Sequence, residues 1–86
     1  MPDETRLHFL LTHAVTEYDR KESRKRFYNR YALALYLGTV HSALEQITAG
    51  QSPRAALCAS FNGRLLDACL KAVGEPRSTR AEQLGL

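Results

Sequence analysis

Residues 30–49, RYALALYLGTVHSALEQITA, decide the fold of this 86-residue chain. Apolar residues recur along the stretch at alternating spacings of four and three, the heptad spacing of a helix that packs against other helices. They are Leu33, Leu37, Val40, Leu44 and Ile47. A second apolar face lies beside them, formed by Ala32, Leu35, Tyr36, Thr39 and Ala43. Because a helix that is apolar on two faces is either central in a bundle or shared with another subunit, we expect this helix to pack on both sides.

An amphipathic helix is predicted before this stretch, over about residues 4–18, because apolar residues recur there at the spacing of one helical face. They are Leu7, Leu10, Leu11, Ala14, Val15 and Tyr18. Residues 19–26 contain no apolar side chain, and Asn29 is a residue type that caps helix starts. We therefore expect a basic connector at 19–29. Since no Gly or Pro lies between Asp3 and Leu37, one continuous helix is the alternative.

A third helix is predicted over about residues 53–73. Ser52 can cap its start, and Pro53 takes the first helical position, where the missing N–H of proline costs nothing. Gly74 is expected to end it. Apolar residues recur between these limits at every fourth position, namely Leu57, Phe61, Leu65, Cys69 and Val73.

A helix-turn-helix within residues 52–73, with residues 61–63 as the turn, is the alternative to that third helix. The motif needs a turn glycine flanked by buried apolar positions. Gly63 is flanked instead by Asn62 and Arg64, and the four-residue repeat continues through it. A continuous helix is therefore favoured.

These elements predict an all-α protein, a small three-helix bundle in a single domain over residues 1–74. The segment 75–86 is polar and is expected to be a mobile tail. A chain of 86 residues buries a modest core. We therefore expect a homodimer through the second helix, with its heptad residues at the interface, because self-association adds burial. These residues are Leu33, Leu37, Val40, Leu44 and Ile47.

Positive charge is concentrated between residues 20 and 30, which hold six of the twelve Lys and Arg residues and one of the nine acidic ones. A local excess of this kind is typical of a surface that meets an anionic partner, most directly phosphate. Arginine suits phosphate because its guanidinium donates two parallel hydrogen bonds. A solvated hydrophilic connector is the alternative explanation. The candidate anion-binding residues are Arg20, Lys21, Arg24, Lys25, Arg26 and Arg30.

Motifs for catalysis and metal binding are missing from the sequence. It has no Gly-rich phosphate loop, no nucleophile elbow, no HExxH and no CxxC. His8 and His13 are five residues apart, about 140° around a helix, so they do not face one site. Cys58 and Cys69 are interpreted as small core residues. We expect no enzyme, cofactor, metal or small-molecule substrate.

The sequence thus favours a non-catalytic, regulatory protein that binds nucleic acid through a phosphate-contacting patch. The N-terminus is acidic and polar rather than a signal peptide, and no apolar run is long enough for a membrane, so a cytoplasmic location is expected. The alternative is a protein–protein interaction module, an adaptor or inhibitor, whose basic run steers it onto an acidic partner.

Overall fold

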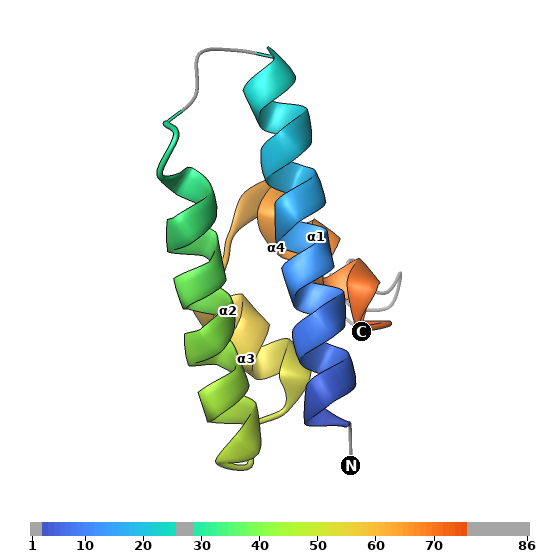
Figure 1. Cartoon of the computed structure of the whole chain (residues 1–86). Coiled ribbons are helices and arrows are strands. Elements are labelled where there is room, and N and C mark those ends of the chain that lie inside the picture. The colour runs from blue at the N-terminus through green and yellow to red at the C-terminus, as the bar shows by residue number, and fades with distance from the viewer. Residues whose placement is uncertain (1–2, 26–28, 76–86) are drawn as a thin grey trace.

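The computed structural model describes residues 3–25 and 29–75, and these contain four helices and no strand. The helices are α1 (Glu4–Lys25), α2 (Ala32–Thr48), α3 (Pro53–Ser60) and α4 (Gly63–Ala72). Figure 1 shows α1 and α2 running antiparallel along the long axis of the molecule, with α3 and α4 behind them. The prediction of an all-α fold is confirmed, with four helices in place of three. The tail beyond Glu75 lies outside the described residues.

Helix α1 continues to Lys25 and therefore includes residues 19–25, which were predicted to form part of a connector. That prediction was wrong because polar residues stabilise this segment along its own length. Glu17 Oε2 lies 2.6 Å from Arg20 Nη2, and Glu22 Oε1 lies 3.8 Å from Lys25 Nζ. Arg24 and Lys25 also lie in the last turn, where the negative end of the helix dipole favours positive charge.

The predicted third helix is interrupted at Phe61 and Asn62, whose backbones are extended, and Gly63 follows with a φ of +58°. The preference for a continuous helix was therefore wrong. The four-residue repeat misled because Phe61 is buried even though it lies between helices. The start of α3 is as predicted, since Ser52 Oγ accepts a hydrogen bond from Ala55 N at 3.1 Å. The interruption gives α4 a direction of its own, and it packs against both α1 and α3.

All four helices and the α3–α4 turn supply the hydrophobic core. The buried apolar residues are Leu7, Leu11, Val15, Val40, Ala43, Leu44, Ala56, Leu57, Phe61, Leu65, Leu66, Cys69 and Leu70. Tyr18 of α1 packs against this core, and its ring meets that of Tyr36 edge to face, with the centroids 6.1 Å apart. The core thus extends along α1 to the start of its charged segment.

The heptad residues of α2 pack within the chain, so Val40 and Leu44 are not available for the predicted contact between subunits. Both side chains are buried, and Leu33 and Ile47 pack against the same core with partial exposure. Leu37, the remaining member of the set, is 37% exposed. The heptad pattern identified an apolar face correctly, but the other helices of the same chain cover most of it.

Candidate functional site

Four of the predicted anion-binding residues lie on the last six residues of α1, and all four are exposed: Arg20, Lys21, Arg24 and Lys25. Successive residues of a helix are about 100° apart, so these side chains project within an arc of about 140°. Glu22 projects toward the other side and is buried, with 7% of its surface exposed. The helical conformation therefore gathers the bases on one side of α1, which a disordered connector would not do. Arg26 lies outside the described residues.

Arg20 is the base of this group whose charge is most directly offset. Its Nη2 donates a hydrogen bond to Glu17 Oε2 at 2.6 Å. This hydrogen bond lowers the pKa of Glu17 and raises the pKa of Arg20, because it stabilises the charged form of each. Among the described residues, Lys21 and Arg24 form no ion pair. Within this group, these two bases are therefore the ones whose charge is least offset by a carboxylate.

A shallow hollow between α1 and α4 adds a residue that the sequence did not single out. The hollow is lined by Tyr18, Glu22, Lys25 and Arg64. Arg64 lies in the first turn of α4, is exposed and lies far along the chain from the basic run. No sequence signal identifies it, because its position beside Lys25 depends on the return of α4 to α1. A base from a second helix thus joins the patch.

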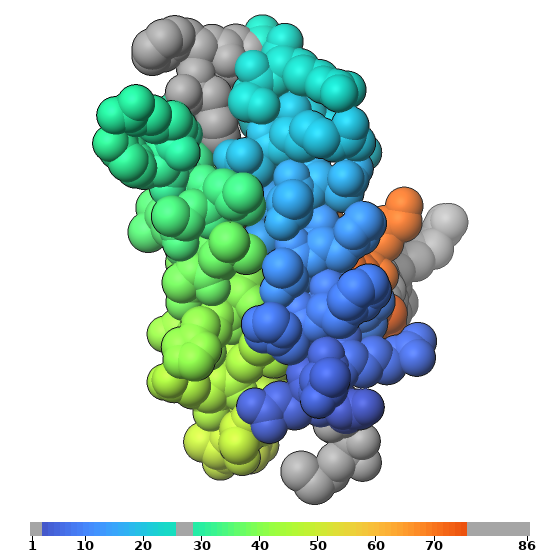
Figure 2. All heavy atoms as spheres, in the orientation of Figure 1, coloured from blue at the N-terminus to red at the C-terminus, as the bar shows by residue number. Residues whose placement is uncertain are grey.

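Arg30 lies at the same end of the molecule as the bases of α1. It comes two residues before α2, and Figures 1 and 2 show the start of α2 and the end of α1 together at one end. Its guanidinium lies 5.0 Å from the centroid of the Tyr31 ring, and its Nη2 donates to the Tyr31 hydroxyl at 2.8 Å. The planar Arg30 group is therefore held in place by Tyr31 while it remains exposed to solvent.

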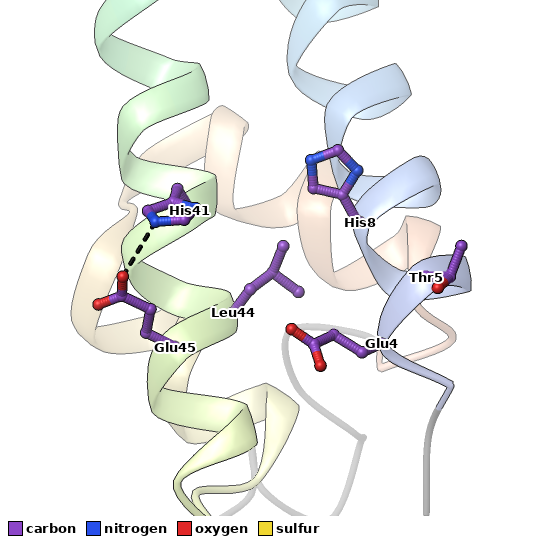
Figure 3. A pocket seen from close by; sticks show the side chains of 6 residues that line it. All are labelled: Glu4, Thr5, His8, His41, Leu44 and Glu45. Carbon is purple, nitrogen blue, oxygen red and sulfur yellow. Dashed lines mark ion pairs between the residues drawn. The ribbon is translucent and has the colours of Figure 1, made fainter.

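A second hollow lies between α1 and α2 toward the opposite end (Figure 3). Its lining includes Glu4 and His8 from α1 and His41 and Glu45 from α2, with Leu44 between them. His41 Nε2 lies 2.9 Å from Glu45 Oε1. Within residues 3–25 and 29–75, however, no three His, Cys, Asp or Glu side chains are placed to hold one metal ion. The hollow is thus a polar cleft at the helix interface that brings two histidines from different helices to one place.

The two cysteines occupy different environments. Cys69 is buried in the core, as predicted, whereas Cys58 is exposed on α3 and contradicts the same prediction. Burial raises the pKa of the Cys69 thiol to about 12, since the thiolate would lose its hydration. The two side chains are both free thiols.

No protein-family model matches this chain, and no curated protein or solved structure matches it. In the part of the chain that the structure describes, no helix has the length and apolar composition needed to cross a membrane. The functional interpretation therefore rests on the charges and contacts of these residues.

Proposed function

We propose that this protein binds nucleic acid without catalysing a reaction and contacts phosphates through the basic surface at the end of α1. The observation that carries the proposal is the gathering of exposed bases within one arc of α1, with Arg64 beside them and Arg30 at the same end. The basic surface is defined as Arg20, Lys21, Arg24, Lys25, Arg30 and Arg64. Arg26 belongs to the proposed set by sequence.

Like charges in this arrangement repel one another, and that repulsion favours an anionic partner. Two pairs of these bases are four residues apart, Arg20 with Arg24 and Lys21 with Lys25. Residues at this spacing are neighbours on the helix surface and lie about 6 Å apart along the helix axis. Such pairs destabilise an isolated helix by a few tenths of a kcal/mol each. A row of phosphates placed against them would remove this cost and release the counterions of the nucleic acid. We further propose that this binding is regulatory, since the proposed protein binds without catalysing a reaction.

The test compares two double variants that change the net charge equally. Lys21→Gln with Arg24→Gln removes two bases from the basic surface. Arg6→Gln with Lys71→Gln removes two exposed bases from elsewhere on the molecule. Fluorescence anisotropy with labelled single- and double-stranded 20-mers at low salt measures the dissociation constant.

We expect the first variant to bind about fivefold more weakly or worse, since two phosphate contacts are lost. The second is expected to stay within about twofold of the unmodified protein, as only long-range charge changes. Equal losses in both variants would show that total charge alone governs binding. No binding by the unmodified protein at low salt would refute the proposal.

A protein-interaction module, acting as an adaptor or inhibitor, is the second candidate. It is favoured by the exposed apolar residues Tyr31 and Leu35, which lie close in sequence to Arg30. The basic surface would then steer association with an acidic protein. Nuclease treatment of protein purified at low salt separates the two candidates. Bound nucleic acid gives excess absorbance at 260 nm, and the nuclease removes this excess. An acidic protein partner stays bound after the same treatment.

We also propose a homodimer and a cytoplasmic setting. The remaining exposed apolar surface of α2 supports the homodimer, since it leaves room for additional burial. A dimer would carry two basic surfaces on one particle.

A further inference from the structure

The outward side of α2 carries no charge for about three turns. Residues 31–40 contain no Asp, Glu, Lys, Arg or His. Tyr31 and Leu35 are 64% and 68% exposed, and Ala34 and Gly38 are exposed beside them. Exposed large apolar side chains on a helix face that itself bears no charge are typical of a contact surface rather than of a solvated helix face. Arg30, whose guanidinium lies 5.0 Å from the centroid of the Tyr31 ring, borders this face at its start. The surface lies opposite the heptad face of α2 that packs into the core.

Among the described residues, no close contact requires a glycine at position 38. Gly38 lies well inside α2, where a glycine costs about 1 kcal/mol relative to alanine. A Cβ atom built at Gly38 would meet no atom of residues 3–25 or 29–75 within 4 Å. Ala34 and Ser42, four residues before and after it, extend a strip of small residues along the helix, and this strip borders a shallow hollow shared with Ala59 and Ser60 of α3. Such a strip allows the backbone of another helix to approach closely.

The charges at the two ends of this surface identify the helix that would fit. Tyr31, Gly38 and Glu45 are seven residues apart and so lie along one side of α2. In an antiparallel pair of α2 helices centred on Gly38, Tyr31 lies opposite the partner subunit's Glu45. Arg30 is the sequence neighbour of Tyr31. At each end of the pair it would therefore lie near the carboxylate of the partner subunit's Glu45. A parallel pair would instead place Arg30 against Arg30 and Glu45 against Glu45.

Arg30 and Glu45 are both accessible for such a contact. Glu45 is exposed and pairs within the chain only with the exposed His41, among the described ion pairs. Figure 3 shows the Glu45 carboxylate next to His41 at the edge of the α1–α2 hollow and pointing away from α1. Exposed pairs of this kind contribute about 0–1 kcal/mol, so they exchange partners at little cost.

We propose that two copies of this chain form a symmetric dimer through the outward side of α2. The helices are antiparallel and cross at Gly38, and an Arg30–Glu45 ion pair closes each end of the interface. Each copy presents the same surface to the other, as two-fold symmetry requires. This interface differs from the predicted heptad interface, which includes the buried residues Val40 and Leu44.

The first test uses Gly38→Leu and nuclease-treated protein at tens of micromolar, with mass measured by sedimentation equilibrium. The unmodified protein is expected at twice the 9.7 kDa of one chain. Gly38→Leu is expected at the mass of one chain with unchanged helical circular dichroism, because a Cβ atom at this exposed position meets no described atom of its own chain within 4 Å. Ala55→Leu, at an exposed position of α3, is the control and should remain a dimer. A single-chain mass for the unmodified protein, or a dimer of Gly38→Leu, overturns the proposal.

The second test reverses the end charges. Arg30→Glu alone and Glu45→Arg alone each place like charges together at both ends and should weaken the dimer at least about tenfold. The combination of both substitutions should restore it, since each pair is formed again with its signs exchanged. Failure of the combination to recover would overturn the antiparallel arrangement. Because nucleic acid is absent, the outcome does not depend on the proposed phosphate contacts.

Discussion

Cys69 links the packing of the core to the behaviour of the protein in alkali. Its thiol is fully buried, and burial raises its pKa from 9.0 to about 12. The unfolded thiol ionises near pH 9, whereas the folded one keeps its proton. The stabilisation is therefore complete below pH 9 and is lost as the pH rises from 9 toward 12.

We expect the free energy of unfolding to fall across this range by up to about 1.4 kcal/mol per pH unit through Cys69 alone. Urea unfolding between pH 8 and pH 10.5 measures this slope. The comparison with Cys69→Ala isolates the contribution of the thiol. The variant should be less stable at pH 8 and should lose less stability as the pH rises. Identical slopes in both proteins would contradict the burial of the thiol.

At the scale of the elements, the short helix α3 depends on its cap. Ser52 Oγ accepts a hydrogen bond from Ala55 N at 3.1 Å, whereas Asn62, the corresponding residue before α4, makes no side-chain cap bond. Ser52→Ala should therefore cost about 1 kcal/mol of stability, and Asn62→Ala should cost clearly less. Urea unfolding of the two variants at pH 7 measures both. Equal losses would show that the Ser52 bond contributes nothing of its own.

The limits of the helices were predictable where residues next to each limit determine it. Ser52 and Pro53 define the start of α3 by cap and backbone geometry, and the structure begins the helix there. The break at Phe61 was not predictable from the apolar repeat, because a buried residue keeps the same spacing whether or not the helix continues. The extension of α1 was missed because charged residues paired at i, i+3 can sustain a helix that buries little.

The candidate site was predictable in part. The bases at the end of α1 lie within six consecutive residues, so their common location follows from the chain itself. Arg64 could not be assigned, since it lines the same hollow as Lys25 only through the packing of α4 on α1. The element that covers the heptad face of α2 was not predictable either. The apolar pattern predicts that Val40 and Leu44 are buried, but it does not tell whether the same chain or a second one buries them.

At the scale of the whole molecule, the basic surface predicts how nucleic-acid affinity depends on salt. If five or six bases contact duplex phosphates, the logarithm of the association constant should fall with the logarithm of salt concentration with a slope of about −5. Lys21→Gln with Arg24→Gln should reduce the steepness by about two, since two released counterions are lost. Anisotropy titrations between 50 and 200 mM NaCl measure both slopes. A slope near zero would mean that the bases do not contact phosphate.

The uneven distribution of charged side chains along the molecule gives it an electric dipole moment. The bases of α1 lie at one end of a body 40 Å long, while Glu4 and Glu45 lie toward the other. A subunit approaching a polyanion would therefore be turned to meet it end-on. In the proposed antiparallel dimer the two moments oppose and cancel, and the basic ends point in opposite directions. Such a dimer would link two separate nucleic-acid strands or duplexes rather than bind a single one with higher affinity.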